Sequence, residues 1–89
     1  MGFGSYIRQL REEKGFKLNE FAQKLEISPA YWSRIEREME KAPKDDLIEK
    51  ASELLGVAAD QAFVEAKRLP PDMVEDLQKV VAMYRRKRI

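Results

Sequence analysis

The side chains of this sequence that are best suited to chemistry are its carboxylates, because the 89-residue chain contains neither histidine nor cysteine. These absences remove the commonest general base and metal ligand, as well as disulfides, thiolate zinc sites and a cysteine nucleophile. The adjacent pairs Glu12-Glu13 and Asp45-Asp46 could serve acid–base catalysis, but they fit a solvated helix face and a helix start. No metal-ligand spacing, glycine-rich phosphate loop or nucleophile–base set occurs. The sequence therefore indicates no enzyme, no metal and no cofactor.

The chain has enough basic residues to bind nucleic acid, but its net charge does not indicate that it does so. The 17 basic and 16 acidic residues leave a net charge of +1. Residues 1–68 carry 12 basic and 13 acidic side chains, whereas residues 69–89 carry 5 and 3. A DNA-binding protein usually displays a basic footprint, so a footprint on this chain must be local.

The length of the chain indicates one small domain with a short appendage. A core of this size is only marginally sufficient, so association could help to stabilise it. Neither a secretory signal peptide nor an apolar run of about 20 residues is found. We therefore expect a cytoplasmic protein without a membrane partner.

Helical periodicity predicts an all-α chain with residues 17–37 as its central motif. The first half of this stretch repeats apolar residues on one helix face, namely Leu18, Phe21, Ala22 and Leu25. Ser28 followed by Pro29 is typical of a helix start, because serine can cap the helix and proline needs no N–H partner there. The connecting turn is too short for antiparallel packing, so the two helices should cross steeply, as in a helix-turn-helix.

The same signals predict four further helices on either side of this motif. They span residues 3–14, 43–55, 59–67 and 71–87. The segment Leu69-Pro70-Pro71 is the one credible boundary between them. We therefore expect a domain of residues 1–68, followed by a C-terminal helix in residues 69–89.

A series of short motif pieces runs without a gap through Pro43. The pieces comprise Ile7, Leu10, Arg11, Lys14, Gly15, Leu18, Glu20, Phe21, Ala22, Leu25, Ile27, Ser28, the segment Ser33-Arg34-Ile35-Glu36-Arg37, and Pro43. In this order they resemble the Xre family of phage repressor/Cro-type helix-turn-helix regulators. The resemblance covers residues 3–56 and implies a repressor-like five-helix domain, with a C-terminal helix added outside the motif.

The resemblance also implies which residues would contact double-stranded DNA. The helix at residues 28–37 would enter the major groove, with base readers at Pro29, Ala30, Tyr31 and Arg34. Arg34 is the best candidate among them, because a guanidinium can pair bidentately with guanine O6 and N7. Phosphate contacts are expected from Lys17, Leu18, Ser28, Ser33, Arg37, Lys41 and Lys44. For each lysine, a merely solvated surface remains an open alternative.

An interior ion pair between Arg11 and Glu36 is a further implication of the resemblance, and it would join the first and third helices. Each of these residues lies beside the apolar stripe of its helix, which favours the pair over two unrelated surface charges. Trp32 occupies the large apolar position of the motif. We therefore expect Trp32 in the core rather than stacked on a base.

Three residues depart from the family pattern. Leu18 stands where many members carry a DNA-contacting glutamine, and Glu26 and Glu38 replace glycines at turns. If Glu26 keeps a left-handed backbone, it costs roughly 1–2 kcal/mol relative to glycine. Glu38 and Glu40 also place negative charge near the expected phosphate path, which counts against tight DNA binding.

The C-terminal helix carries an apolar seam about three turns long. Its residues are Met73, Leu77, Val80, Val81 and Tyr84. We expect this seam to form a homodimer or to bind a protein partner, since many repressors need two copies to span two half-sites. The alternative is a sixth helix that packs back on its own domain.

These observations predict a dimeric repressor that acts by occupying its operator. A second interpretation of the same fold is an antitoxin-type autorepressor that binds a toxin through residues outside the motif. A third is a protein-interaction module that kept the fold and lost DNA binding, which Glu26, Glu38, Glu40 and the nearly neutral charge favour.

Overall fold

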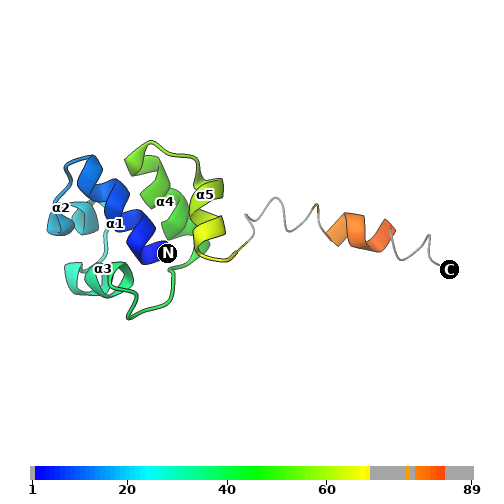
Figure 1. Ribbon diagram of the computed structural model, residues 1–89, viewed down its shortest axis with the longest axis horizontal. Helices are drawn as coiled ribbons and strands as arrows, with labels where there is room; N and C mark the ends of the chain where they lie inside the picture. Colours follow the sequence, from blue (N-terminus) through cyan, green and yellow to red (C-terminus); the bar gives the residue numbers. More distant parts are fainter. Residues whose placement is uncertain (1, 69–75, 77, 84–89) are drawn as a thin grey trace.

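Five α-helices follow one another in the first 68 residues (Figure 1). They are α1 (Phe3–Glu13), α2 (Leu18–Lys24), α3 (Pro29–Glu36), α4 (Asp45–Leu55) and α5 (Ala59–Glu65). The computed structural model describes residues 2–68, 76 and 78–83, and this part of the chain contains helices and turns but no strand. The all-α prediction is confirmed, and each of the helices α1 to α5 begins and ends within two residues of its predicted bounds. None of the described helices is long and apolar enough to cross a membrane.

The core between these helices contains a cluster of aromatic rings where α2 and α3 meet. Phe21 of α2 and Trp32 of α3 are fully buried, with ring centroids 5.6 Å apart. Phe16 extends the cluster at 5.5 Å from Phe21. Fully burying such a side chain contributes about 1.5–3 kcal/mol, so these rings hold the two motif helices in a fixed relation. The prediction that Trp32 belongs to the core is confirmed.

Each of these five helices ends in the same reverse turn, a Schellman motif. At the end of α1, the N–H of Gly15 donates to the Glu12 carbonyl at 3.0 Å, and the N–H of Phe16 donates to the Arg11 carbonyl at 3.1 Å. The same pair of hydrogen bonds recurs at every helix end. The residues of positive φ at the other four turns are Glu26, Glu38, Gly56 and Lys67.

Three of the five turns place a residue other than glycine in the left-handed region. The φ angles are 61° at Glu26, 60° at Glu38 and 58° at Lys67. Such a backbone crowds Cβ against the following carbonyl and costs roughly 1–2 kcal/mol relative to glycine. The turns at Glu26 and Glu38 therefore adopt the left-handed conformation that glycine favours, although neither residue is glycine.

The N-terminal turn of α1 lies directly against the end of α3. A Cβ atom on Gly4 would lie 2.1 Å from the carbonyl oxygen of Ile35 and 2.9 Å from that of Glu36. No real side chain tolerates these distances, and the atoms in the way belong to the backbone. Glycine is therefore required at position 4 for α1 and α3 to approach this closely.

Residues 76 and 78–83 are helical and exposed, as the orange segment of Figure 1 shows. Within this segment Val80 is 60% exposed, Val81 39% and Met83 58%. Their exposure does not support the alternative of a helix packed back on its own domain. The other seam residues, Met73, Leu77 and Tyr84, lie outside the described residues, and the division of the chain after residue 68 stays a prediction.

Candidate nucleic-acid interface

The third helix has one face in the core and one face in solvent. Ser28 caps its start, because the Ser28 hydroxyl accepts a hydrogen bond from the N–H of Tyr31 at 3.1 Å, and Pro29 follows in the first turn. The inner face consists of Trp32, Ile35 and Glu36. The predicted base readers lie elsewhere on the helix, with Pro29, Ala30 and Arg34 exposed and Tyr31 half-buried. The helix therefore presents all four of these side chains at least partly to solvent.

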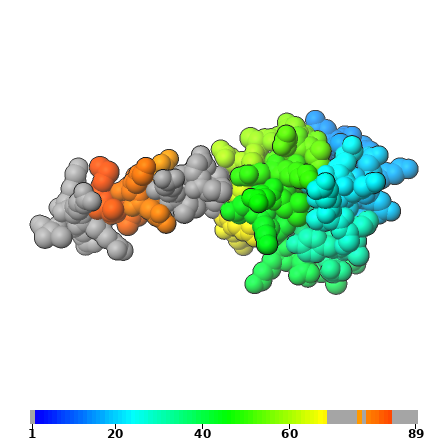
Figure 2. Space-filling model, turned by 180° about the vertical axis from the view of Figure 1, so that it is seen from behind, coloured from blue at the N-terminus to red at the C-terminus, as the bar shows by residue number. Residues whose placement is uncertain are grey.

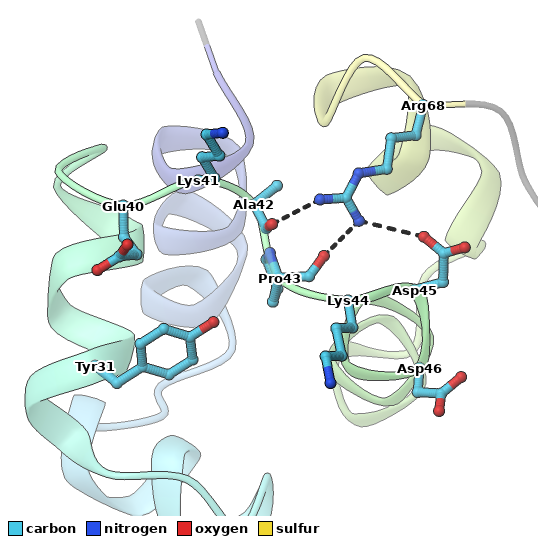
Figure 3. Close-up of a pocket in the computed structure, with 9 residues that line it drawn as sticks. All are labelled: Tyr31, Glu40, Lys41, Ala42, Pro43, Lys44, Asp45, Asp46 and Arg68. Atoms are coloured by element: carbon cyan, nitrogen blue, oxygen red, sulfur yellow. Dashed lines mark hydrogen bonds and ion pairs between the residues drawn. The ribbon is translucent and has the colours of Figure 1, made fainter.

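The predicted phosphate-binding residues fall on two parts of the surface. Lys41 and Lys44 lie in the loop between α3 and α4, where they line one open pocket together with Tyr31 (Figure 3). Lys17 and Leu18 line a separate shallow pocket at the start of α2. Figure 2 shows the face opposite to that of Figure 1, where the cyan to teal surface of α2 and α3 adjoins the green surface that follows. Of the predicted phosphate-binding residues, Lys41 and Lys44 thus share one pocket, and Lys17 and Leu18 share another.

The remaining members of that set have different surroundings. Ser28 is exposed, although its hydroxyl is already the acceptor that caps α3. Ser33 is half-buried. Arg37 is exposed, and its Nε donates to the carbonyl of Ser33 at 3.4 Å. Arg37 is therefore an exposed residue whose side chain lies along the last turn of α3.

Arg34, the predicted guanine reader, has an acidic neighbour. Its Nε donates to Oε2 of Glu40 at 3.4 Å, and both side chains are 44% exposed. The two residues are six positions apart, which is not a neighbouring pair on any helix. The turn at Glu38 brings them together, so this contact was not predicted from sequence spacing.

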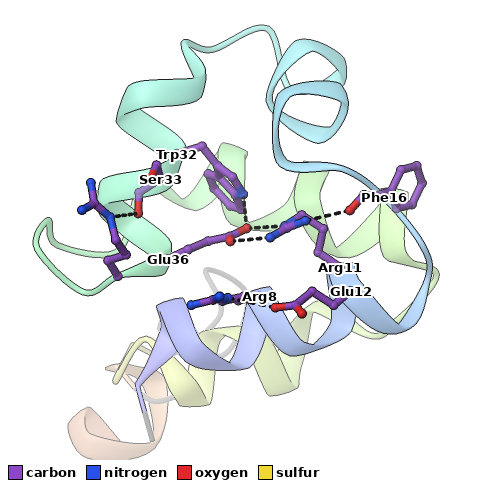
Figure 4. A network of polar contacts seen from close by, with 8 residues as sticks. Arg8, Arg11, Glu12, Phe16, Trp32, Ser33 and Glu36 are labelled. Atoms are coloured by element: carbon purple, nitrogen blue, oxygen red, sulfur yellow. Dashed lines mark hydrogen bonds and ion pairs between the residues drawn. The ribbon is translucent and has the colours of Figure 1, made fainter.

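A buried polar network fixes the inner face of α3 (Figure 4). Nε and Nη2 of Arg11 donate to the two carboxylate oxygens of Glu36, at 2.7 Å and 2.9 Å. The indole Nε1 of Trp32 donates to Glu36 at 2.6 Å, and Nη1 of Arg11 donates to the carbonyl of Phe16 at 2.7 Å. The hydrogen bonds that Arg11 donates to Glu36 raise the pKa of Arg11 against the lowering effect of burial. The ion pair that the resemblance implies is therefore present and joins α1 to α3.

The loop between α3 and α4 is anchored at both ends. At its start, the carboxylate of Glu38 accepts a hydrogen bond from the N–H of Ser5 at 3.3 Å. Before α4, the guanidinium of Arg68 donates to the carbonyls of Ala42 and Pro43 and contacts Asp45 (Figure 3). Arg68 belongs to the turn that ends α5, because its N–H donates to the carbonyl of Phe63. The loop that carries Glu40 and Lys41 is thus tied to α1 and to α5.

Among the described residues, no group of three or more acidic side chains has a geometry that could hold a metal ion.

The helix-turn-helix family model HTH_3 matches residues 7–61, more than half of the chain. The chain belongs to this helix-turn-helix family. The match begins within α1, contains the complete α2–turn–α3 motif and ends within α5. The resemblance to Xre-type regulators is confirmed.

Two curated relatives of this helix-turn-helix chain are bacterial regulators. The HTH-type transcriptional regulator SinR of Bacillus subtilis is 40% identical over 55 residues, which are 62% of this chain and 50% of SinR. The HTH-type transcriptional regulator RamB of Mycobacterium tuberculosis is 43% identical over 56 residues, or 63% of this chain and 12% of RamB. The chain therefore spans half of SinR and a small part of RamB.

Solved structures share the helix-turn-helix fold. A crystal structure of SinR, described as the master regulator for biofilm formation, in complex with DNA has a TM-score of 0.64 at 36% identity, covering 68% of this chain and 97% of that chain. The complex of SinR with the SinI protein has a TM-score of 0.65 at 30% identity, covering 89% and 78%.

Proposed function

We propose that this helix-turn-helix chain is a sequence-specific DNA-binding transcriptional regulator that reads the major groove with α3. The observation that carries the proposal is the two-sided character of α3. Its inner face is fixed by the Arg11–Glu36 ion pair, while Pro29, Ala30 and Arg34 are exposed on the helix. The similarity to a SinR structure that contains DNA supports the same conclusion.

In this proposal each base-reading residue makes the kind of contact that its side chain allows. The Arg34 guanidinium pairs with guanine O6 and N7, and the methyl group of Ala30 meets a thymine methyl. Tyr31 contacts a base edge or a phosphate, and Pro29 adds an apolar contact. Since few of these readers form hydrogen bonds, we expect modest specificity for each half-site.

Phosphate contacts supply the salt-dependent share of the affinity. We assign these contacts to the residues predicted from the sequence, which are Lys17, Leu18, Ser28, Ser33, Arg37, Lys41 and Lys44. Lys41 and Lys44 have the best support, because both are exposed in an anchored loop beside Tyr31.

We further propose that the protein acts as a homodimeric repressor through its C-terminal helix. Val80 and Val81 are exposed there on adjacent positions of a helical segment, and burying them would favour association. Two recognition helices would then occupy successive major grooves and block transcription. An antitoxin-type autorepressor that binds a protein through the same helix is the second candidate, and the existence of a SinR–SinI protein complex favours it.

The protein-interaction module without DNA binding is the candidate from another functional class. Glu26, Glu38 and Glu40 are exposed and lie at the two ends of α3 or just beyond it. Their negative charge weakens phosphate attraction over this surface. The proposal of a DNA-binding regulator therefore needs a direct test of sequence-specific binding.

Selection of bound duplexes from a randomised DNA library, at low and at near-physiological salt, tests the proposal. We expect enrichment of inverted half-sites about one helical turn apart. Arg34→Ala should remove the preference at one base position. Arg8→Ala is the matched control, because Arg8 is an exposed arginine of α1 that pairs with Glu12. Without enrichment, or with weak binding that disappears as salt rises, the regulator proposal fails and the interaction module is favoured.

A further inference from the structure

The contact between Arg34 and Glu40 uses one particular nitrogen of the guanidinium. Nε of Arg34 donates to Glu40 Oε2. Within the described residues, Nε is the only nitrogen of this guanidinium with a hydrogen-bond partner. The two terminal amino groups are the remaining donors of the planar fork. The carboxylate thus contacts the guanidinium at Nε, while the Arg34 side chain as a whole is 44% exposed.

The backbone brings Glu40 to this position by a defined turn. With Glu38 in the left-handed region, the chain reverses after α3, and the N–H of Met39 donates to the carbonyl of Arg34 at 2.9 Å. The hydrogen bond from Ser5 to the Glu38 side chain holds the same turn against α1. Glu40 is therefore the second residue after a turn that is hydrogen-bonded to α1.

The loop is also held on the other side of Glu40. Arg68 donates to the carbonyls of Ala42 and Pro43, two and three residues further along the chain. Glu40 and Tyr31 both line the pocket shown in Figure 3, between α3 and this loop. Residues on both sides of Glu40 are therefore hydrogen-bonded to other parts of the fold.

From this geometry we propose that Glu40 is a positioning residue for Arg34. The Glu40 carboxylate orients the guanidinium so that its terminal amino groups can donate to a guanine. The inference rests on the proposed function of α3 as a DNA reader. A long arginine side chain loses rotamer freedom when it binds, and a partner that already holds its plane reduces that loss. Bidentate pairing with guanine O6 and N7 also depends on the orientation of that plane.

The charge of Glu40 distinguishes this role from a simple phosphate contact. A carboxylate near the DNA repels phosphates, so it lowers the affinity for every duplex, whatever its sequence. A residue that weakens general binding while it orients a base reader increases discrimination between sequences. The proposal therefore predicts that removing the Glu40 side chain lowers the base preference without lowering the affinity for DNA in general.

The experiment compares the full chain with Glu40→Ala, Glu40→Gln, Arg34→Ala and the Arg34→Ala/Glu40→Ala double variant. Glu53→Ala serves as the matched control, because Glu53 is an exposed glutamate near the far end of α4. Each variant is checked for folding by circular dichroism. Each is then measured for affinity to the duplex that the wild type selects, to the three duplexes changed at the Arg34-dependent base pair, and to a scrambled duplex.

For Glu40→Ala we expect the preference at the Arg34-dependent base pair to fall about three- to tenfold, the range of an exposed ion pair strengthened where DNA excludes water. Affinity for the scrambled duplex should rise or stay unchanged. Glu40→Gln should keep most of the preference, because its amide oxygen still accepts from Nε. In the Arg34→Ala background, removing Glu40 should cause no further loss of preference.

Other results would overturn the inference. If Glu40→Ala keeps the full base preference, or reduces affinity equally for every duplex, Glu40 does not position Arg34. The same conclusion follows if Arg34→Ala changes no base preference while the wild type still selects a site. If the wild type selects no site, the proposed function itself fails, and this result is distinct from the others.

Discussion

The carboxylate of Glu38, at the end of α3, accepts a hydrogen bond from the backbone N–H of Ser5 in the first turn of α1. The helix α1 has no side-chain cap of its own, since its N-cap residue is Gly2. A negative side chain near the positive end of a helix dipole is also favourable. Glu38 therefore has two opposed effects, because it caps α1 while its own backbone is strained at a φ of 60°.

These opposed effects can be separated by two substitutions at position 38. Glu38→Ala keeps the strained backbone and removes the cap, so we expect a loss of about 1 kcal/mol in unfolding free energy. Glu38→Gly removes the cap and relieves the strain, so its effect should lie within about 1 kcal/mol of zero. Urea denaturation measures both. Equal losses for the two variants would show that the strain is negligible.

The other strained turns offer simple stabilising substitutions. Glu26→Gly and Lys67→Gly each place glycine where φ is positive, and we expect each to raise the unfolding free energy by about 1 kcal/mol. For Glu26 the loss of its contact with Lys50, 3.5 Å long and exposed, subtracts little. Thermal unfolding should show a rise of about 4–8 °C for each kcal/mol gained. A lower melting temperature for both variants would refute the strain argument.

Replacing Gly4 by alanine should lower the unfolding free energy more than the same replacement at a glycine with open space around it. Gly4→Ala forces a Cβ against the Ile35 carbonyl, and we expect a loss of about 2–3 kcal/mol from the overpacking. Gly56→Ala is the control, because nothing lies within 4 Å of its Cβ position and only the positive φ opposes it. Its cost should be about 1 kcal/mol. Chemical denaturation ranks the two, and a smaller cost at position 4 would contradict the close contact between α1 and α3.

The Arg11–Glu36 pair should behave as one unit. Removing one partner leaves a buried charge alone, so Arg11→Met or Glu36→Leu should each cost about 3–5 kcal/mol, whereas the double variant should cost much less than the sum. Trp32 donates to Glu36 and is the single tryptophan of the chain, so its fluorescence reports the network directly. Additive losses in the double variant would indicate that the two residues act independently.

The outcome at α3 shows what the sequence could and could not predict. The helix and its inward residues follow from local spacing and from the Ser28-Pro29 start, and the structure agrees with both. Glu36 has two side-chain partners. The family pattern implied the contact with Arg11, whereas Trp32 was predicted only as an apolar core residue and not as a hydrogen-bond donor to Glu36. A buried indole N–H needs a hydrogen-bond acceptor, and this requirement could have predicted an acceptor beside Trp32.

The contacts of the loop after α3 could not be predicted, and the reason is geometric. Glu38 to Ser5, Glu40 to Arg34 and Arg68 to Ala42 all depend on how a left-handed turn redirects the chain. Glutamate at such a turn gives a weaker signal than glycine, so the sequence showed an unusual residue without showing where its side chain would lie. Negative charges that seemed to oppose DNA binding have structural partners in the folded domain.

Arg68 connects the end of α5 to the loop before α4. Its guanidinium supplies hydrogen bonds to the carbonyls of Ala42 and Pro43 and an ion pair to Asp45, which lies at the start of α4. A chain cut after residue 67 would leave those carbonyls to water and release the loop from α5, whereas a chain cut one residue later would keep every one of these contacts. We therefore expect the shortest fragment that keeps this loop anchored to include Arg68, beyond the end of α5.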